Sequence, residues 1–365
     1  MRKAQILGTG WLGDGDSAGY HGWPTLIRCA DGRLLAACSG ERLAHVCPCG
    51  RVVIYESADN GATWSAGRIL TDGPLDDRDA GLIQTPAGTL LINWFTSIAF
   101  IDCGPTGHPE STRIHPKAAV WNETEERLTV ADIRRHHGFF MKRSTDGGKT
   151  WSDKYRVPLN NVHGPSVLDD GSLLWTGRDV SKTSILGGNV NGPRSIVCRS
   201  VDDGLTWEEI GEIPPAEGHV PAKYHELHQI QAADGSIICH IRNQNYRSDN
   251  EGPTTWQCIS TDGGRTWTKP EFVFKGFPSH LLRLKDGRLM ASYGMRSRPY
   301  GNQVRFSDDC GRTWSEPVII SDDAVSNDLG YTSTAELEDG TFFSLWYEHR
   351  PQNDGVALLR YARWK

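Results

Sequence analysis

The segment from Leu75 to Gly81 gathers several groups that can move protons within a few residues. It holds the carboxylates Asp76, Asp77 and Asp79 and the guanidinium of Arg78, and an apolar run follows directly. A positioned carboxylate whose pKa is tuned by its surroundings can serve as a general acid and base, and we consider Asp79 or Asp77 for that role. The alternative is a solvated turn in which Arg78 pairs with an aspartate.

A second cluster of reactive side chains contains His45, Cys47 and Cys49. His45 is a further candidate proton donor, because the ordinary pKa of histidine lies in the working range of most enzymes. A zinc site would need a second pair of ligands that the C-x-C spacing does not supply, so packing of a loop is the simpler interpretation. No dinucleotide, phosphate-loop or metal-ligand signature is present. We therefore expect no cofactor, and leave a structural calcium ion open.

Composition and charge narrow the class of ligand. The 365 residues have a net charge of -6 and no run of basic side chains, which argues against nucleic acid or an anionic membrane as the main partner. No stretch approaches the roughly 18 apolar residues of a membrane helix, and no secretory core is recognisable. The nine cysteines are an odd number, which favours reduced thiols. We expect a cytoplasmic protein with a small or neutral ligand and leave its oligomeric state open.

Two interleaved repeats indicate the elements that position these groups. The first, Ser-x-Asp-x-Gly-x-Thr-Trp, occurs five times, at residues 57–64, 144–151, 200–207, 260–267 and 307–314. Each copy follows a short β-like run, and its Asp and Gly suit the turn of a hairpin. The Trp is expected to begin the return strand and to pack one repeat against its neighbour.

The second repeat is an apolar run, a turn glycine and another apolar run. It occurs six times, at Gly32, Gly88, Gly171, Gly235, Gly287 and Gly340. Units of roughly 50–60 residues can hold the four short strands of a propeller blade. The prediction is an all-β fold, a six-bladed β-propeller that forms a single domain over residues 1–365.

Two parts of this propeller are predicted to be irregular. An insertion at about residues 100–140 in the second blade is expected to be a long loop, in which a hairpin is one option and residues 126–137 could form a short helix. The sixth unit lacks the Ser-x-Asp turn, so the N-terminal segment is expected to supply its last strand. Such a strand would close the ring and remove exposed sheet edges.

Five histidines precede strand starts at a comparable phase. The same phase in different blades means the same end of a propeller, so the set indicates a polar central pocket. A single histidine would more often be a structural residue, but we expect two or three of the five to contact the ligand. The five are His21, His163, His225, His228 and His280.

The five Ser-x-Asp-x-Gly-x-Thr-Trp copies in a six-unit β chain resemble the Asp-box repeats of the sialidase (neuraminidase) superfamily, over nearly the whole chain. These repeats identify the fold strongly and the function weakly, because Asp boxes lie away from the site and also occur in non-catalytic propellers. Their Ser, Asp and Trp residues are therefore interpreted as structural.

The resemblance extends to positions of the sialidase site. Glu226, nine residues before Gly235, is similar to the Glu that polarises the nucleophile, and Arg242, seven residues after that glycine, is similar to one arginine of a carboxylate-binding triad. In the sixth unit, Tyr331 matches the tyrosine nucleophile. Glu348 matches the carboxylate that orients an arginine, with one extra residue before it.

The fifth unit offers Arg298, or as second choice Arg296, as another triad arginine. The chain departs from the family in its first unit, where Gly22 stands at the position of the remaining triad arginine. The loop of residues 41–51 also lacks an Asp at the place of the usual general acid and base. The second unit offers replacements, since Arg78 could supply the third positive charge for a substrate carboxylate.

The chemistry of these residues is coherent without the family name. A phenol with a pKa near 10 is a poor nucleophile, so Tyr331 needs an adjacent carboxylate, such as Glu226, to take its proton. A neutral tyrosine also suits attack beside a substrate carboxylate, which would repel a carboxylate nucleophile. Two arginines can bind that substrate group through their planar donor forks.

The leading hypothesis is an exo-acting, retaining glycoside hydrolase of sialidase type, which cleaves a terminal sialic acid or a related acidic sugar from glycans through a tyrosyl intermediate. One alternative is a polysaccharide lyase, or a hydrolase of a non-sialic uronic or neutral sugar. The other is a non-catalytic glycan-binding propeller. A lyase would release an unsaturated product that absorbs in the ultraviolet, and a binding module has no need of the Tyr331–Glu226 pair.

Overall fold

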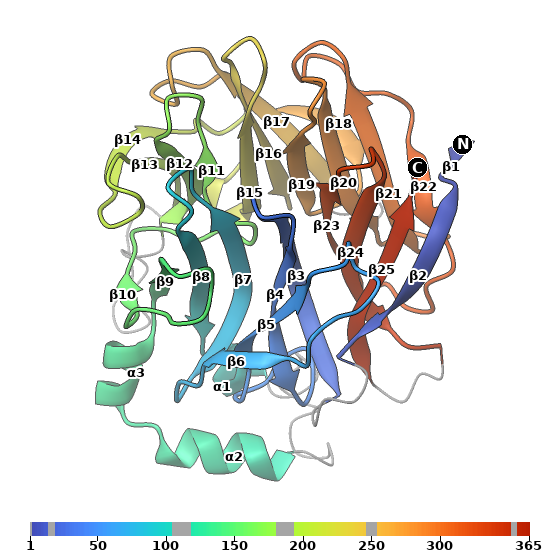
Figure 1. Ribbon diagram of the computed structural model, residues 1–365. Helices are drawn as coiled ribbons and strands as arrows, with labels where there is room; N and C mark the ends of the chain where they lie inside the picture. Colours follow the sequence, from blue (N-terminus) through green and yellow to red (C-terminus); the bar gives the residue numbers. More distant parts are fainter. Residues whose placement is uncertain (1, 14–18, 104–117, 180–192, 246–253, 352–355) are drawn as a thin grey trace.

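The protein folds into a ring of antiparallel β-sheets, and Figure 1 shows its computed structural model. The structure describes residues 2–13, 19–103, 118–179, 193–245, 254–351 and 356–365. In this part of the chain, the ring accounts for nearly all the strands, and three short α-helices lie together between β8 and β9. No helix among these residues is long and apolar enough to cross a membrane.

The strands follow one another in short runs, as the two repeats predict. Their bounds are β1 (Arg2–Lys3), β2 (Ile6–Leu12), β3 (Tyr20–Arg28), β4 (Leu34–Arg42), β5 (Arg51–Ser57), β6 (Arg68–Thr71), β7 (Asp76–Gln84), β8 (Leu90–Ser97), β9 (Phe139–Ser144), β10 (Tyr155–Arg156), β11 (Ser166–Val167), β12 (Leu173–Asp179), β13 (Arg194–Ser200), β14 (Glu208–Glu212), β15 (Tyr224–Gln231), β16 (Ile237–Asn243), β17 (Thr254–Ser260), β18 (Glu271–Lys275), β19 (Ser279–Arg283), β20 (Leu289–Met295), β21 (Gly301–Ser307), β22 (Val318–Ser321), β23 (Gly330–Glu336), β24 (Phe342–His349) and β25 (Ala357–Trp364).

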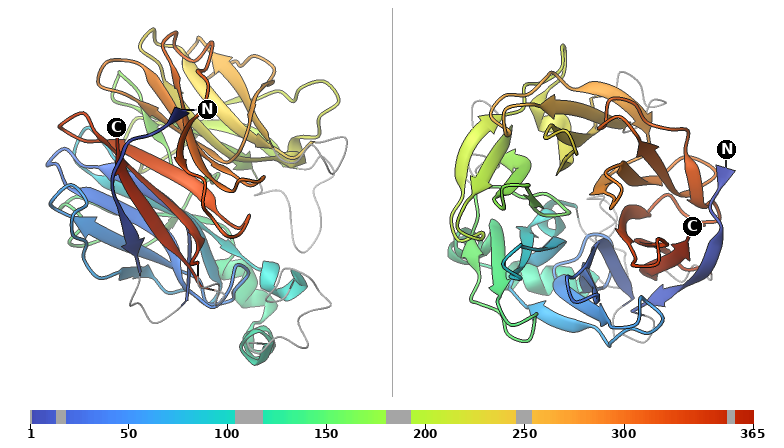
Figure 2. Two further views of the ribbon diagram at one scale, coloured as in Figure 1. Left: turned by 90° about the vertical axis from the view of Figure 1, so that its right-hand side faces the viewer. Right: turned by 45° about the horizontal axis from the view of Figure 1, so that its top comes forward.

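Strand pairing among the described residues gives five hydrogen-bonded sheets, not six separate ones. Three sheets are runs of four strands, β7–β10, β11–β14 and β15–β18, and β19–β22 form a fourth sheet with β1 at its edge. The last and first groups of strands join into one eight-stranded sheet, because Ala357 of β25 pairs in parallel with Tyr20 of β3. The propeller fold is confirmed, and the right-hand view in Figure 2 shows the sheets arranged around a common axis.

The Ser-x-Asp-x-Gly-x-Thr-Trp segments form the turns between the third and fourth strands of their sheets. In the first copy, the Ser57 hydroxyl donates to Asp59 Oδ1 at 2.8 Å and accepts from the Gly61 N–H at 2.9 Å, and Thr63 donates its N–H and its hydroxyl to the Asp59 carboxylate. The same Ser–Asp and Gly–Ser bonds recur in the other four copies. These carboxylates therefore close turns.

The Trp of each copy lies a few residues before the return strand or directly beside its start, whereas the sequence predicted it as the first strand residue. Trp64, Trp151, Trp207, Trp267 and Trp314 each pack on a different hydrophobic core. Most of these cores combine side chains from two neighbouring sheets. The tryptophans thus stabilise the contacts within and between sheets, as expected.

The predicted long loop at residues 100–140 contains helices. They are α1 (Ala99–Cys103), α2 (Ala118–Arg127) and α3 (Val130–His136), while residues 104–117 lie outside the described residues. The expected short helix at residues 126–137 overlaps α3, which Thr129 caps through a reciprocal pair of bonds with Asp132. No hairpin is present among the described residues of this segment. Figure 1 shows these helices at one end of the ring.

The N-terminal segment completes the sheet of the last strands, as predicted. Strand β2 pairs antiparallel with β25, from Ile6 opposite Trp364 to Leu12 opposite Leu359. Strand β1 then continues to the neighbouring sheet, where it pairs in parallel with β22. The two ends of the chain therefore hold the ring closed across two adjacent sheets.

Candidate active site

Four residues with left-handed backbone conformations mark one end of the ring. They are Trp23 (φ +56°), Asp79 (φ +54°), Glu226 (φ +36°) and Tyr331 (φ +55°), on β3, β7, β15 and β23. Each lies where the pairing with the next strand shifts register. A positive φ is unusual for a residue other than glycine and clusters at functional sites.

These bulges occupy the same position in each unit. Every one of the four residues stands nine positions before the turn glycine of its own unit. The first strands pack side by side around the axis, β23 on β3, β3 on β7 and β19 on both β15 and β23. A bulge redirects the side chain that it carries, so the equivalent positions bring these side chains toward a common centre.

Tyr331, Glu226 and Arg242 form a hydrogen-bonded cluster at this centre. The Tyr331 hydroxyl donates to Glu226 Oε1 at 2.6 Å, and Arg242 Nη1 donates to both Glu226 oxygens at 2.8 and 3.0 Å. Arg242 Nη1 also lies 3.3 Å from Tyr331 Oη. The structure therefore brings together three residues that the sequence analysis had placed in one candidate site.

The surroundings of this cluster fix its resting charge. Burial and the neighbouring Glu226 raise the pKa of Tyr331 well above its usual value, so the phenol is protonated at rest. Burial alone would raise the pKa of Glu226, but Arg242, His225, the Tyr331 hydrogen bond and Arg296 together outweigh it, and the net direction is downward. The resting site therefore contains a neutral phenol hydrogen-bonded to a carboxylate anion.

Arg296, the second choice of the sequence analysis, lies beside this cluster. Its guanidinium carbon is 5.7 Å from the centre of the Tyr331 ring, and it donates to Leu329 O at 2.9 Å and to Tyr347 Oη at 3.2 Å. The first choice, Arg298, is exposed and stacks on the Tyr300 ring instead. The preference for Arg298 was therefore wrong in geometry.

Glu348 does not face the cluster. It is buried, accepts from Arg360 Nη1 at 2.8 Å and from Trp346 Nε1 at 2.7 Å, and so orients an arginine outside the site. The extra residue before it is the physical reason, because neighbouring strand residues point to opposite faces. Tyr347 takes the inner face of β24, where it packs near Tyr331 at 5.9 Å between ring centres.

A carboxylate that the sequence analysis did not single out collects several of these groups. Asp328 accepts from the hydroxyls of Tyr20 and Tyr347 at 2.8 and 2.7 Å, and lies 3.0 Å from His45 Nδ1 and 3.1 Å from His349 Nε2. His45, which follows β4, is thus held by a carboxylate from the segment before β23. Burial lowers the pKa of His45 despite this neighbour.

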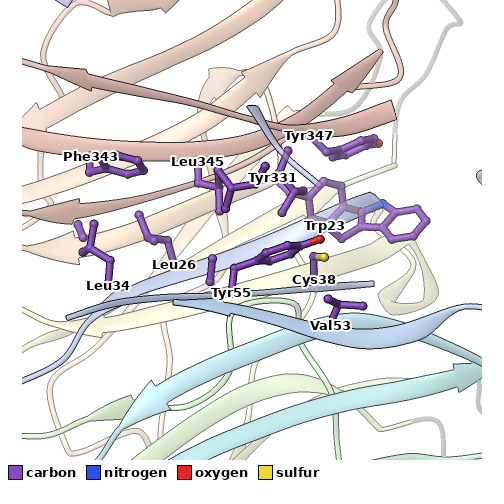
Figure 3. Close-up of a cluster of buried hydrophobic side chains, with 14 of the residues drawn as sticks. Trp23, Leu26, Leu34, Cys38, Val53, Tyr55, Tyr331, Phe343, Leu345 and Tyr347 are labelled. Atoms are coloured by element: carbon purple, nitrogen blue, oxygen red, sulfur yellow. The ribbon is translucent and has the colours of Figure 1, made fainter. Parts of the chain in front are cut away.

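Trp23 fills the space beside the position of the missing first-unit arginine. Its side chain is 1% exposed, and the guanidinium carbons of Arg78 and Arg42 lie 4.1 and 4.8 Å from the centre of its ring. Figure 3 shows Trp23 next to Tyr331 and Tyr347 at one end of a buried cluster. The two cations therefore contact the indole, and neither reaches Glu226 or Tyr331 through a hydrogen bond.

The four residues Asp76 to Asp79 form the start of strand β7, and the alternative of a solvated turn is wrong. Asp76 is buried and forms an ion pair with the buried Arg42, and Arg78 Nη1 is 3.9 Å from the same carboxylate. Asp77 accepts from the Thr71 hydroxyl at 2.6 Å and from Trp94 Nε1 at 2.8 Å. These contacts hold Asp76 and Asp77 inside the sheet, whereas Asp79 lines the same cavity as Glu226.

Asp79 is the titratable group best placed to exchange protons near the cluster. Burial, supported by the nearby Glu226 charge, raises its pKa to about 7, and its Oδ1 has no hydrogen-bond partner among the described residues. Asp79 and Glu226 both line a cavity of about 760 Å³ that extends to α1, α3 and β9. This cavity is large enough for a sugar ring and its substituents.

The histidines divide into three groups, so the prediction of one shared end was too simple. His163, His228 and His280 contact one another, with ring centres 4.9 to 5.0 Å apart, and line a second cavity of about 650 Å³ along the axis. His21 is buried, with Nδ1 3.2 Å from the Tyr55 hydroxyl. Of the five, only His225 lines the cavity that contains Glu226, where His137 is a further lining histidine.

The Cys47 thiol packs in a loop core with Phe100 and Trp121, as the simpler interpretation supposed. Its Sγ accepts from the N–H groups of Leu43 and Cys49, both at 3.3 Å. Across the described ranges, no group of three or more His, Cys, Asp or Glu side chains is arranged to hold a metal ion.

Arg178 is a cavity residue that the sequence analysis missed. It lies at the end of β12, and its Nη1 is 3.1 Å from His225 Nδ1. A signal for it was present, because Arg178 stands seven residues after Gly171, the offset that Arg242 has from Gly235. Applying that offset to every unit would also have identified Tyr347, seven residues after Gly340.

A β-propeller with a buried tyrosine, glutamate and arginine at one end is the architecture of the sialidase superfamily, and comparisons with known proteins agree. The sequence pattern of the family described as BNR repeat-like domain matches residues 110–344. The chain belongs to this family. A sialidase from Bacteroides fragilis is 23% identical over 376 residues, which cover 93% of this chain and 62% of that protein.

Solved structures show the same fold. A protein of unknown function from Dyadobacter fermentans has a TM-score of 0.76 at 21% identity, with both chains fully covered. The intramolecular trans-sialidase from Ruminococcus gnavus has a TM-score of 0.66 at 14% identity, covering 99% of this chain and 97% of that one. The chain spans about 60% of the length of the first sialidase relatives that it matches by sequence.

Proposed function

We propose that this protein is an exo-acting, retaining glycoside hydrolase of sialidase type, in which Tyr331 attacks the anomeric carbon of a terminal acidic sugar. The observation that carries the proposal is the 2.6 Å hydrogen bond from the Tyr331 hydroxyl to Glu226. A glycan-binding protein would gain nothing from a buried phenol whose proton is shared with a carboxylate. In this proposal the ring has six units, with the eight-stranded sheet counted as two.

In the first step, the Tyr331 oxygen forms a bond to the anomeric carbon while its proton passes to Glu226. Because the pKa of Tyr331 is raised at rest, this transfer accompanies the attack, when positive charge develops on the sugar. Arg242, which bonds both Glu226 oxygens, holds the carboxylate in line with the phenol. Asp79 gives its proton to the departing oxygen, for which a pKa of about 7 is suitable.

In the second step, the Asp79 carboxylate removes a proton from water as that water attacks the anomeric carbon. The bond to Tyr331 breaks, Glu226 returns its proton to the phenolate, and the sugar leaves with its original anomeric configuration. Arg296 and Arg242 are the arginines nearest to Tyr331, and they would stabilise the negative charge on Glu226 and on the phenolate.

Tyr331→Phe tests the proposal, because it removes one oxygen atom and leaves the packing of the ring in place. The substrates are 4-methylumbelliferyl N-acetylneuraminic acid and a panel of other acidic and neutral 4-methylumbelliferyl glycosides. Turnover of whichever substrate the wild type cleaves should fall at least about 1,000-fold in Tyr331→Phe, with affinity retained. A fluorinated analogue of that substrate should label Tyr331 covalently, as detected by peptide mass spectrometry.

The matched control is Tyr293→Phe. Tyr293 is also a buried phenol, but its hydroxyl contacts Gln303 at 3.1 Å in the core of the fifth group of strands. This control should keep wild-type turnover. Equal activity of Tyr331→Phe and Tyr293→Phe would contradict the proposed nucleophile.

A further inference from the structure

Arg178 lines the same cavity as Glu226, and it forms no ion pair with a carboxylate of the described residues. Its Nη1 faces His225 Nδ1 at 3.1 Å, and its Nη2 has only a long contact of 3.4 Å to Ala222 O. Its Nε is buried with no acceptor within hydrogen-bonding distance, and no carboxylate of the described residues lies within 4.0 Å of its guanidinium. Buried charges in proteins are normally paired, so this environment is incomplete.

Two other arginines of the same face have anionic partners, whereas Arg296 donates to Leu329 O and Tyr347 Oη. Arg242 is paired with Glu226 at 2.8 Å, and Arg42 forms an ion pair with Asp76. Asp179, the residue after Arg178, points to the other face of β12 and pairs with Arg194 at 3.1 Å. The nearest acid in sequence is therefore engaged elsewhere, and Arg178 differs in this respect from Arg242 and Arg42.

The residues around Arg178 do not neutralise it. Burial lowers the pKa of His225 to about 4, so near neutral pH this imidazole is uncharged and its Nδ1 accepts from Arg178. Burial also lowers the pKa of Arg178 itself, which is the direction expected for a cation short of compensating charge. Glu226 is the closest anionic influence, but it is already bonded to Arg242 and Tyr331.

The cavity has two chemically different walls. Asn160, Asn161, Arg178 and His225 form a polar wall beside Glu226, and the residues from β8, α1, α3 and β9 form a mostly apolar wall that also contains Thr96, Ser97 and His137. Arg178 is the only arginine or lysine among the described residues that line it. An anionic group bound beside Arg178 would meet one cation and two amide side chains, in a cavity that Glu226 and Asp79 also line.

We propose that Arg178 binds an anionic substituent, a carboxylate or a sulfate ester, of the sugar that occupies this cavity. The proposal rests on the glycoside hydrolase function proposed above and assigns its acid recognition to the third unit of the ring. The first unit, which has Gly22 and a buried Trp23 at the corresponding place, does not contribute such a cation. A ligand anion would pair with the guanidinium through Nη2, where protein contacts are weakest.

The test measures binding of free sugars to the whole chain by isothermal titration calorimetry, in pairs that differ in charge. The pairs are N-acetylneuraminic acid and its methyl ester, D-glucuronic acid and D-glucose, and D-galactose 6-sulfate and D-galactose. For at least one pair, the wild type should bind the acid about 10- to 100-fold more tightly than its neutral counterpart. The sugar pair that shows this preference tells whether the bound group is a carboxylate or a sulfate.

Arg178→Gln should remove this preference and leave the neutral sugar unaffected, whereas Arg178→Lys should keep part of it. Arg298→Gln is the matched control, because Arg298 is exposed and outside the cavity, and it should keep the full preference. Thermal unfolding of each variant shows whether it is folded. The proposal is overturned if no acid is preferred by the wild type, or if Arg178→Gln retains the preference.

The two proposals fail separately. If Tyr331→Phe keeps full turnover while Arg178→Gln loses acid preference, the hydrolase mechanism is wrong and the acid site remains. If Tyr331→Phe loses turnover while Arg178→Gln binds acids as the wild type does, the mechanism remains and Arg178 has no part in recognition.

Discussion

Asp79→Asn should make the protein more stable at neutral and alkaline pH, because it removes a carboxyl group that is costly to ionise. Asp79 is 7% exposed, and burial raises its pKa from 3.8 to about 7. In the unfolded chain the same group loses its proton near its ordinary pKa. Between these two values the unfolded state binds fewer protons than the folded state, so stability falls as pH rises.

The magnitude follows from the difference between the two pKa values. A difference of about three corresponds to about 4 kcal/mol, lost at about 1.4 kcal/mol per pH unit between roughly pH 4 and pH 7. Below pH 4 the carboxyl is protonated in both states and the substitution should change little. Above pH 7 the advantage of Asp79→Asn should reach a plateau.

The assay is urea denaturation of wild type and Asp79→Asn at unit intervals from pH 4 to pH 8, with the free energy of unfolding compared at each pH. Asp308→Asn is the control, since the Asp308 side chain is 83% exposed and a surface substitution should change the free energy of unfolding by no more than about 0.5 kcal/mol. A constant difference between wild type and Asp79→Asn over this range would refute the argument that Asp79 is poised near neutrality. The same titration predicts that turnover of the wild type declines as pH rises through about 7.

Three further substitutions test other parts of the structure. Trp23→Ala should lower the free energy of unfolding by about 3–5 kcal/mol in urea denaturation, because it empties a fully buried indole site. Ser200→Ala should cost about 1–3 kcal/mol by the same assay, because it leaves the Gly204 N–H, now 2.9 Å from Ser200 Oγ, without an acceptor. Glu348→Ala should destabilise the fold by about 1–3 kcal/mol, because it leaves the buried Trp346 Nε1 without its acceptor while Arg360 keeps Asp323. It should leave KM and kcat unchanged, and a selective loss of turnover would contradict the assignment of Glu348 outside the site.

The regular parts of the fold were predictable because the same local physics recurs along the chain. Each Ser-x-Asp turn is closed by bonds among residues a few positions apart, such as Ser57 with Asp59, so the pattern alone specifies the turn. The pairing of β2 with β25 followed from the sixth unit lacking such a turn. The parallel bridge between Ala357 and Tyr20, which merges two groups of strands into one sheet, depends on three-dimensional approach and has no local signal.

The helices of the insertion were only partly predictable. Helix α3 has a local signal in its Thr129–Asp132 cap. In α2, Trp121 packs with Leu75 and Phe100 in a core that forms only when distant segments meet. Short helices are marginal without such tertiary packing. The sequence of this segment shows no clear helical periodicity, so it did not predict α2.

In the candidate site, residues on regular offsets were predictable and residues after irregular segments were not. Glu226 and Tyr331 share their spacing from a turn glycine, and the structure brings them into contact. The choice between Arg296 and Arg298 depended on how the chain bends after β20, and Glu348 on a single extra residue that reverses which face it occupies. Asp328 lies in a connecting segment before β23, where no repeat fixes its position.

The four left-handed positions suggest how proteins of this architecture diversify. Trp23, Asp79, Glu226 and Tyr331 occupy equivalent backbone sites, while the hydrogen bonds that define the turns lie elsewhere in each unit. The determinants of folding and of chemistry are therefore carried by different residues of one repeat. A single substitution at such a position can exchange a nucleophile, an acid or an aromatic wall without altering the turns, which gives the ring a modular route to new specificities.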